Sequence, residues 1–294
     1  MSRRVVLIGP GRLGQAVGKL LVDAGYELRA LVSRDPGRAV AAARFAGCRK
    51  AATTDLSKAR EGDLVLLALP DDHLEEMAAA LRREGHLHPD AILVHFSGIH
   101  PAAILLQGDK PPRQALSIHP LQSFADSVMG VRNLPGSPFA VEGAEELLPL
   151  AEKLVEDLGG TPFRIAGDQK ALYHAAACVA SNYLVTLTAA AGQILAACGF
   201  GQDEAVRLLS PLLRGTGKNL AALGPEAALT GPIARGDVQT VTRHGQAIAA
   251  LPPDLREIYS VMGRKTVELA KRKGTLDEAT GKEILEILST IERG

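Results

Sequence analysis

The sequence is poor in the residues that mark several classes of protein. It contains no tryptophan and only 3% aromatic residues, so we expect no surface on which nucleic-acid bases stack. Its formal net charge is zero, which gives no basic face for nucleic acid or anionic lipid. No apolar run approaches the ~20 residues that span a bilayer. The run after Arg3 and Arg4 is too short for a signal peptide, so neither a membrane span nor a signal peptide is expected.

Cysteine is also scarce. The three cysteines, Cys48, Cys178 and Cys198, are too widely spaced for a metal cluster and too few for a disulfide framework. We therefore expect core thiols in a protein of the reducing cytoplasm, and no metal site. With 294 residues, 46% of them apolar, the chain has enough material for a large core and for two domains.

Residues 1–166 alternate short β-rich runs with helical patterns. The expected strands are 3–9, 27–33, 63–70, 91–98, 114–119, 138–143 and 161–166. The expected helices between them are 11–25, 36–47, 71–85 and 144–160. This alternation predicts an α/β domain of the Rossmann type, with a parallel, doubly wound sheet.

Residues 167–294 change in character, because strand signals fade and helical ones dominate. The expected helices are 168–198, 203–222, 237–251, 254–273 and 277–292. Prolines separate several of them, and no flexible linker precedes the first. The sequence thus predicts an all-α domain over 167–294, joined directly to the α/β domain over 1–166.

A glycine-rich loop follows the first strand and opens the first helix. Gly9, Gly11 and Gly14 form G-x-G-x-x-G in this strand–turn–helix context. In a dinucleotide site these glycines permit the turn, the approach of the pyrophosphate and the packing of helix on strand, while the helix N-terminus faces phosphate. The expected contacts are Gly9, Pro10, Gly11, Arg12, Leu13 and Gly14. The alternative is a glycine turn that binds nothing.

The end of the second strand indicates which dinucleotide binds. An NAD site places an acidic residue about 20 residues after the glycines, a point occupied here by Ser33 and Arg34. A hydroxyl and a guanidinium suit the 2′-phosphate of NADP, with Arg12 and Arg38 as further candidates. Asp35, just before Pro36, is expected to cap the next helix. The alternative is that Arg34 is an ordinary solvent-exposed arginine.

Three stretches end strands at the edge where such sheets bind ligands. Leu69 and Pro70 end one strand beside the expected cofactor. The next two strands end in stretches that offer hydroxyl, imidazole and amide groups: His95, Ser97, His100, His119, Gln122 and Ser123. Single histidines are more often structural, but several at successive strand ends favour a site, with Ser97 and His119 the preferred candidates.

The stretch "GDQKALYHAAACVASNYL" (167–184) places polar residues in an alanine-rich helix. At ~100° per residue, His174 lies about 40° and Ser181 about 20° from Lys170, so these residues share a face that Asn182 could flank. A charged lysine is costly among apolar groups, so Lys170 should face water, an acid or a ligand. The alternative is that Lys170 reaches solvent from the first turn.

The stretch 229–245 is a further candidate. Asp237, Thr240 and His244 recur on one helical face, and Arg235 just before them could bind a substrate carboxylate in two-point contact. The alternative is an Asp N-cap within a polar network between helices.

Five motifs, "LIGPGRLG", "SGIHP", "SIHPLQSF", "K..YHAAA..ASNYL" and "LTGPIARGD..T...H", together resemble a family of Rossmann-like NADP oxidoreductases. Members carry a helical C-terminal domain of unknown function, and the family is similar to the 6-phosphogluconate dehydrogenase/β-hydroxyacid dehydrogenase superfamily. In that superfamily a lysine and an amide residue one turn later carry catalysis. The resemblance places Lys170 at the lysine, whereas His174 stands where relatives usually have asparagine.

The resemblance implies an NADPH-dependent oxidoreductase that reduces a small 2-oxo acid, with ketopantoate as one candidate. Lys170 would polarise the carbonyl and supply the proton, with His174 as a second donor; Ser97, His119 and Asn182 would orient the substrate, and Arg235 would bind its carboxylate. One alternative is an oxidoreductase of imines or of prephenate-type acids, because the architecture is similar to pyrroline-5-carboxylate reductases and "HPLQSF" also resembles the His-Pro stretch of prephenate dehydrogenases. Another is a non-catalytic NADP-binding protein. The helical half is expected to form a homodimer, since its apolar faces exceed what one sheet edge can cover.

Overall fold

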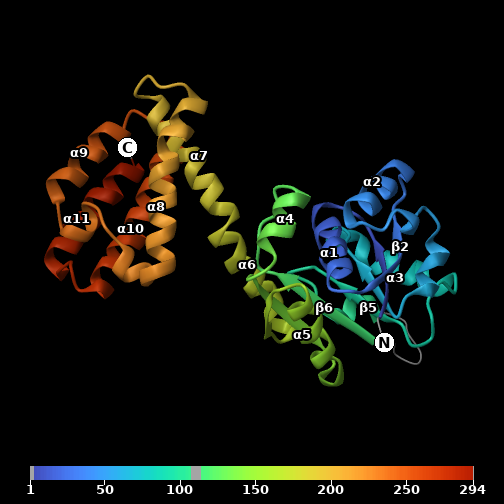
Figure 1. Cartoon of the computed structure of the whole chain (residues 1–294). Helices are drawn as coiled ribbons and strands as arrows, with labels where there is room; N and C mark the ends of the chain where they lie inside the picture. Colours follow the sequence, from blue (N-terminus) through green and yellow to red (C-terminus); the bar gives the residue numbers. More distant parts are fainter. Residues whose placement is uncertain (1–2, 107–113, 294) are drawn as a thin grey trace. The chain divides into compact units, whose positions relative to one another are not determined.

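The computed structural model describes residues 3–106 and 114–293 (Figure 1). It divides into two compact units, Met1–Ser181 and Asn182–Gly294. The first contains an eight-stranded sheet and the second is helical, which confirms the expected fold class. The division falls after the boundary that we expected at 166/167, because the helix that begins at Lys170 groups with the sheet.

The sheet has the strand order β3-β2-β1-β4-β5-β6-β7-β8. Its strands are β1 (Arg4–Ile8), β2 (Glu27–Val32), β3 (Ala52–Thr53), β4 (Leu64–Leu67), β5 (Ile92–His95), β6 (Gln114–Pro120), β7 (Pro138–Gly143) and β8 (Thr161–Arg164). The order 3-2-1-4-5-6 is that of Rossmann dinucleotide-binding folds, in which the ligand lies where the strand order reverses. Here that point is the carboxyl end of β1 beside β4.

One pairing departs from the parallel sheet that the sequence predicts, because β7 runs antiparallel to β6. A parallel return needs a crossover along the sheet. The connection here contains only the short helix α4 (Ser127–Asn133), which packs on α1 (Arg12–Asp23) instead. Gly130 of α4 fits tightly against Ala16, where an added Cβ would lie 2.8 Å from the Ala16 Cβ. The last two strands therefore run opposite to the first six.

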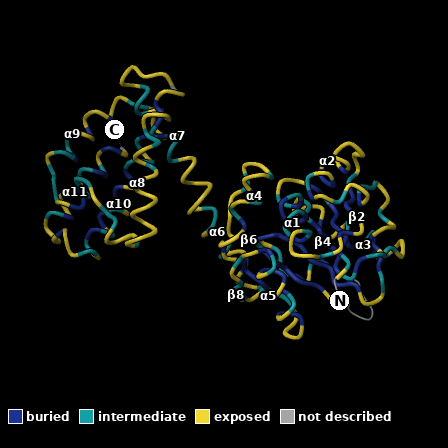
Figure 2. The backbone as a smooth tube through the Cα atoms, in the orientation of Figure 1, coloured by how far each residue is buried: buried dark blue, intermediate teal, exposed yellow. Residues whose placement is uncertain are grey.

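Helices cover both faces of the sheet. The core on one face joins the strands to α1, α2 (Pro36–Ala46) and α5 (Leu148–Asp157). The core on the other face joins them to α3 (Leu74–Arg83) and to 3-10 turns. Strands β1 and β4 are buried on both faces, which explains their continuous apolar sequences. In Figure 2 the region of β4 is drawn in the colour of buried residues. This core fixes the strand ends that carry the candidate site.

The predicted helix 168–198 is interrupted. The structure has α6 (Lys170–Ala180) and α7 (Asn182–Ala196), and Ser181 between them has φ −118° and ψ −67°. Serine and asparagine weaken helices because their side chains compete for backbone hydrogen bonds.

The segment Gly167–Ala196 is long and apolar enough, by length and composition alone, to cross a membrane. Its most apolar window has a mean hydropathy of 1.3 and is 11% buried.

The second unit consists of helices. After α7 come α8 (Gln202–Ala228), α9 (Val238–Ile248), α10 (Pro253–Lys273) and α11 (Glu278–Arg293). α8 leaves helical geometry at Gly224, which has a φ of 74° and precedes Pro225. A core of aliphatic side chains holds α9, α10 and α11 together, including Val241, Val267 and Leu288.

Candidate active site

The three glycines of the loop after β1 have distinct environments. Gly9 has a φ of 91°, and a Cβ there would lie 2.6 Å from the Ala68 carbonyl oxygen. A Cβ on Gly14 would lie 2.5 Å from the Gly9 carbonyl oxygen, so helix α1 packs closely on the turn. A Cβ on Gly11 would meet no atom within 4 Å among the described residues. The chain is thus open at Gly11, where a pyrophosphate would approach.

The N-terminus of α1 is free to receive an anion. Its N-cap residue is Gly11, which offers no side-chain cap, and its first turn contains no acidic residue. Arg12 is exposed and donates to the Phe124 carbonyl oxygen over 3.3 Å, while Pro10 is buried and Leu13 half-buried. Leu69, after β4, lies against Gly9, and the exposed Pro70 follows it. Free N–H groups and the helix dipole favour a phosphate at this point.

The end of β2 fits NADP. The Asp35 carboxylate accepts a hydrogen bond of 3.0 Å from the Arg38 backbone N–H and is the N-cap of α2, as expected. The Ser33 hydroxyl accepts from the Asp35 N–H over 3.2 Å, and Arg34 is exposed. The acid is therefore engaged within the fold, while the guanidinium remains accessible to a 2′-phosphate.

Lys170, at the start of α6, is fully buried, with an exposed fraction of 0%. Its Nζ donates to the Ser97 carbonyl oxygen over 3.0 Å and to the Ser117 hydroxyl over 2.7 Å. Burial lowers the pKa of Lys170 to about 8, against the opposing effect of the Glu142 and Asp71 carboxylates. The side chain does not reach solvent from the first turn; it ties α6 to the turn after β5 and to the middle of β6.

Two histidines beside Lys170 remain partly exposed. His119, on β6, and His174, on α6, have ring centroids 5.9 Å apart. They flank Gly98, where a Cβ would lie 2.4 Å from His174 Cδ2 and 2.8 Å from His119 Nε2. Burial, then the nearby Lys170 and His174, lowers the pKa of His119 to about 4. His119 is therefore a neutral imidazole at pH 7.

The turn after β5 is built around His95, which is fully buried. Its Nδ1 accepts from the Ser97 N–H over 3.1 Å, and its Nε2 lies 3.2 Å from the Pro101 carbonyl oxygen. The Ser97 hydroxyl accepts from the N–H groups of Ile99 (3.2 Å) and His100 (3.1 Å). Burial lowers the pKa of His95 to about 3, so this imidazole is a neutral structural group. It fixes the Ser97–Gly98 turn against which Lys170 and the two histidines lie.

Three residues of this cluster are absent from the sequence-based candidates: Ser117, Glu142 and Tyr173. Ser117 could have been found, since it shares a face of β6 with His119. Glu142 lies on β7, where its carboxylate accepts a 2.6 Å hydrogen bond from the Ala102 N–H. The Tyr173 hydroxyl lies 2.8 Å from His119 Nδ1. The contacts of Glu142 and Tyr173 join elements that are distant in the sequence, so residue spacing does not predict them.

Other predicted candidates lie elsewhere. Ser181 is exposed at the C-cap of α6 and is not part of a continuous helical stripe, because the helix ends there. Gln122 donates to the Ser137 hydroxyl over 3.2 Å, and Ser123 is exposed beside it. Asn182 and Arg235, both exposed, belong to the second unit. The structure thus groups Ser97, His119, Lys170 and His174.

The stretch around Arg235 forms the polar network that was the alternative. Asp237 is the N-cap of α9 and accepts from the Thr240 N–H over 3.0 Å. His244 Nδ1 lies 3.0 Å from the Tyr259 hydroxyl on α10. These side chains stabilise helix ends and helix packing. Arg235 and Arg243 are the exposed basic residues of this stretch.

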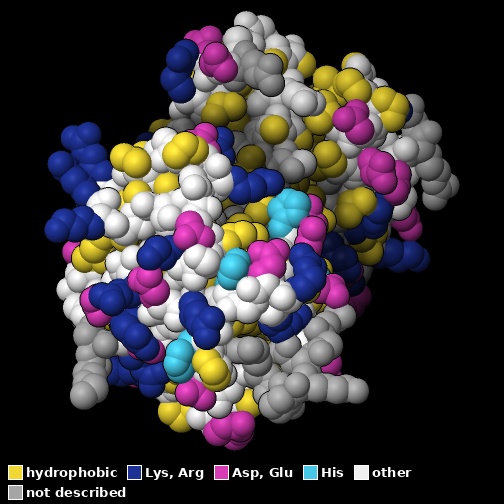
Figure 3. Space-filling model, turned by 90° about the vertical axis from the view of Figure 1, so that its right-hand side faces the viewer, with side chains coloured by type: hydrophobic (Ala, Val, Ile, Leu, Met, Phe, Trp, Pro, Cys, Tyr) yellow, Lys and Arg dark blue, Asp and Glu magenta, His cyan; other side chains and the backbone are white. Residues whose placement is uncertain are grey.

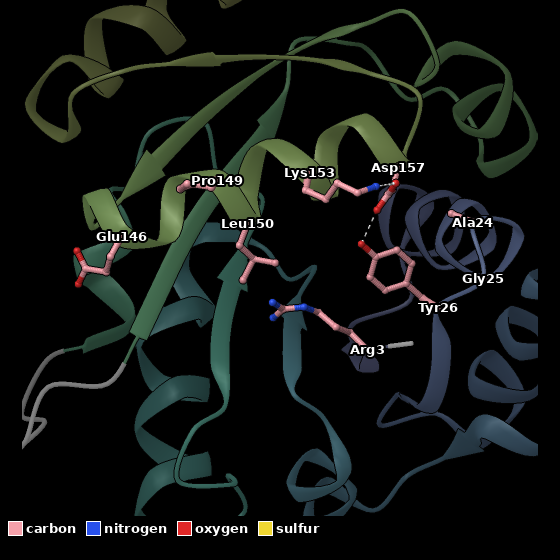
Figure 4. A pocket seen from close by; sticks show the side chains of 9 residues that line it. All are labelled: Arg3, Ala24, Gly25, Tyr26, Glu146, Pro149, Leu150, Lys153 and Asp157. Carbon is pink, nitrogen blue, oxygen red and sulfur yellow. Dashed lines mark hydrogen bonds and ion pairs between the residues drawn. The ribbon is translucent and has the colours of Figure 1, made fainter. Parts of the chain in front are cut away.

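A hollow of about 590 Å³ lies at the opposite, amino edge of the sheet (Figure 4). Arg3 and Tyr26, which precede β1 and β2, line it together with residues of α5. The Tyr26 hydroxyl donates to Asp157 over 2.7 Å, and Lys153 pairs with the same carboxylate. The hollow is remote from the carboxyl edge, where Rossmann folds bind ligands.

Basic and acidic side chains are interspersed over the face drawn in Figure 3, in line with the zero net charge.

Comparisons with known proteins agree with this organisation. Residues 4–96 match the family described as NADP oxidoreductase coenzyme F420-dependent, and residues 137–266 match a domain of unknown function, DUF2520. A search of curated proteins gives no match.

Several solved structures are similar over the whole chain. Protein TM1727 of Thermotoga maritima is 27% identical with a TM-score of 0.64, covering 98% of each chain. A candidate NADP oxidoreductase of Bacteroides fragilis is 21% identical with a TM-score of 0.65, covering 100% of this chain and 99% of the other. A pyrroline-5-carboxylate reductase of Coxiella burnetii is 14% identical with a TM-score of 0.56, covering 100% and 98%.

The open glycine loop, the engaged Asp35 and the family match over residues 4–96 all point to NADP as the cofactor. The protein is an NADP-dependent oxidoreductase, with an NADP oxidoreductase domain matched over residues 4–96 and the domain DUF2520 matched over residues 137–266.

Proposed function

We propose that the protein is an NADPH-dependent reductase of a small 2-oxo acid. The observation that carries this proposal is the cluster of Lys170, His119 and His174 in the unit that also carries the open glycine loop. When bound, the nicotinamide supplies the hydride for the carbonyl carbon, and the carbonyl oxygen takes one proton. A binding protein without catalysis needs no such set of proton-carrying groups.

The exposed fractions divide the roles within this cluster. His119 and His174 are partly exposed on either side of Gly98, so they can contact a substrate carbonyl oxygen. We assign His119 to hydrogen bonding of that oxygen and His174 to delivery of the proton. Lys170 is enclosed, so we assign it to holding the Ser97 turn and to stabilising negative charge on the oxygen. In this assignment the histidines contact the substrate carbonyl oxygen directly, whereas from the sequence we expected that contact from Lys170.

The substrate acid is proposed to be small, with ketopantoate as the first candidate. Arg235, which suits a carboxylate, and Asn182, which suits substrate orientation, are both exposed residues of the second unit and stay candidates by residue type.

Two measurements test the function. Titration calorimetry should show tighter binding of NADP⁺ than of NAD⁺, because Arg34 is available to the 2′-phosphate and Asp35 is engaged. Loss of NADPH absorbance should then be followed with ketopantoate and related 2-oxo acids, and with cyclic imines and prephenate. Turnover confined to imines or to prephenate would support the alternative oxidoreductase classes. Tight NADPH binding with no turnover on any of these compounds would support a non-catalytic protein.

We further propose that the second unit forms a homodimer of a cytoplasmic protein. Large apolar side chains of α7 and α8 are exposed, including Tyr183, Val185, Leu208, Leu212 and Leu223. The same helix α8 carries the charged residues Arg207, Arg214 and Lys218, which suit a surface bordered by water rather than lipid. A second copy offering the same face is the occupant that we propose.

Light scattering should therefore give twice the mass of the chain for the wild-type protein. The variant Leu212→Glu should be a monomer, because Leu212 is 66% exposed on α8 and a charge there would oppose the packing of a second copy. Val40→Glu, on α2, should leave the mass unchanged. A monomer that partitions into lipid vesicles would instead support the membrane interpretation of residues 167–196. Cell fractionation tests the location.

A further inference from the structure

A tyrosine beside the two histidines forms a defined contact with one of them. The Tyr173 hydroxyl lies 2.8 Å from His119 Nδ1, and the two rings meet edge to face with centroids 5.5 Å apart. Phe163 of β8 also packs edge to face against Tyr173, with centroids 5.9 Å apart. Tyr173 is therefore held in place from β6 and from β8.

The direction of this hydrogen bond follows from the chemistry of the two groups. A phenol is a good donor and a weak acceptor, because its lone pair is delocalised into the ring. Burial raises the pKa of Tyr173 to about 12, so the hydroxyl keeps its proton near pH 7. A neutral imidazole carries its proton on one nitrogen only, so a donor at Nδ1 leaves the proton on Nε2.

The other nitrogen of His119 lies close to Gly98. A Cβ on Gly98 would lie 2.8 Å from His119 Nε2, so a glycine is needed for the ring to approach the turn this closely. Among the described residues, the hydrogen bond of the His119 ring is the one at Nδ1, which leaves Nε2 for a ligand. His119 is itself partly exposed, whereas the neighbouring Ser117 and Lys170 are fully buried. Nε2 is therefore the nitrogen of His119 that a ligand oxygen can reach.

We propose that Tyr173 is a positioning residue that donates to His119 Nδ1 and so presents the Nε2–H group to the carbonyl oxygen of the substrate. This inference rests on the proposed function for the identity of that oxygen, but the state of His119 does not depend on it. His119 then acts as a neutral hydrogen-bond donor, and the proton that completes the alcohol comes from His174. Tyr173 acts through His119 and does not itself contact the substrate.

The experiment compares Tyr173→Phe with wild type by two readouts. Long-range ¹H–¹⁵N NMR of ¹⁵N-histidine protein reports which nitrogen of each ring is protonated, and His119→Gln assigns the His119 signals. Wild type should show His119 protonated on Nε2, and Tyr173→Phe should show an altered pattern for that ring. Tyr259→Phe is the matched control, because Tyr259 contacts His244 Nδ1 over 3.0 Å in the same manner. It should change the signals of His244 and leave those of His119.

The second readout is steady-state kinetics with the best 2-oxo acid. Tyr173→Phe should lower kcat on the order of tenfold with less effect on KM, since donor catalysis is typically worth 10²–10⁴-fold and is only partly lost. Tyr26→Phe, which loses a tyrosine hydrogen bond at the opposite edge, should leave kcat unchanged. In a His119→Gln background, Tyr173→Phe should have no further effect, because its target is absent.

The outcomes separate the two proposals. A wild-type His119 protonated on Nδ1, or a kcat that Tyr173→Phe leaves unchanged, overturns the role of Tyr173. Absence of turnover on every 2-oxo acid overturns the proposed function, and the NMR readout still decides the state of His119.

Discussion

Replacement of Lys170 by methionine tests how the buried ammonium is balanced. Its pKa of about 8, against an ordinary 10.5, means that the charged form costs the fold on the order of 3 kcal/mol at pH 7. Methionine removes this cost at similar volume but also removes the ammonium donor of the Ser97 carbonyl and the Ser117 hydroxyl, which then keep only their mutual 3.5 Å hydrogen bond. A buried polar group without a good partner costs roughly 1–3 kcal/mol. The two effects oppose each other, so Lys170→Met should change the stability at pH 7 by less than about 3 kcal/mol.

The pH dependence separates the two effects. Below pH 8 the lysine is charged in both the folded and the unfolded chain, and the full cost is present. Between pH 8 and 10.5 the folded protein loses the proton first, so the wild type gains stability as the pH rises. The difference between wild type and variant should therefore shift in favour of the wild type by on the order of 2.5 kcal/mol between pH 7 and pH 10.

Urea unfolding followed by far-UV circular dichroism at both pH values measures this difference, and the contributions of other titrating groups cancel in the comparison. Lys265→Met is a matched control, because Lys265 is largely exposed and pairs with Glu268 at the surface. It should show no such shift. If Lys170→Met differs from wild type by the same amount at pH 7 and pH 10, the assignment of a buried, charged Lys170 is refuted.

Three further predictions follow from the geometry. Gly98→Ala should lower kcat more than about tenfold because its Cβ would lie 2.4 Å from His174 Cδ2, whereas Gly215→Ala, in open space on α8, should retain full activity. Arg34→Gln should weaken NADP⁺ binding roughly tenfold in calorimetry, because a charge-assisted contact is lost, and should have little effect on NAD⁺ binding. Arg44→Gln, also at an exposed arginine, is the control. Equal loss of affinity for both cofactors would contradict the assignment of Arg34 to the 2′-phosphate. His95 has a pKa of about 3 in the folded chain, against 6.5 in the unfolded chain, because its burial favours the neutral imidazole. This contribution to the free energy of unfolding is complete above about pH 6.5 and is lost as the pH falls toward 3. The loss should be on the order of 2.5 kcal/mol at pH 4.5. Urea unfolding at pH 7 and 4.5 should show this loss in wild type and a smaller one in His95→Gln; an equal loss in both would argue against a buried neutral His95.

Features set by neighbouring residues could be predicted from the sequence. The loop of Gly9, Gly11 and Gly14 and the Asp35 cap involve contacts within a few residues, where spacing determines geometry. The alternation of strands and helices likewise gave the fold class, because each element carries its own periodicity.

Features set by distant contacts could not be predicted. Lys170 is enclosed by Ser97 and Ser117, which lie 73 and 53 residues away in the sequence, so its helix alone could not show whether it faces water. The reversal of β7 depends on the packing of α4 on α1, and the end of α6 at Ser181 depends on a local balance that periodicity does not report. The contact of Tyr173 with His119 on β6 joins residues far apart in the sequence, so it could not be predicted from the helix that contains Tyr173.

We propose hydride transfer from NADPH to a 2-oxo acid at the cluster of His119, His174 and Lys170. The most direct measurement incubates the protein with NADPH deuterated at the transferable C4 position and a mixture of small 2-oxo acids, cyclic imines and prephenate, and reads the products by mass spectrometry. We predict one 2-hydroxy acid with a single deuterium on C2, formed by wild type and strongly reduced in His119→Gln. Deuterium in an amine or in no product, with NADPH bound, would contradict the claim.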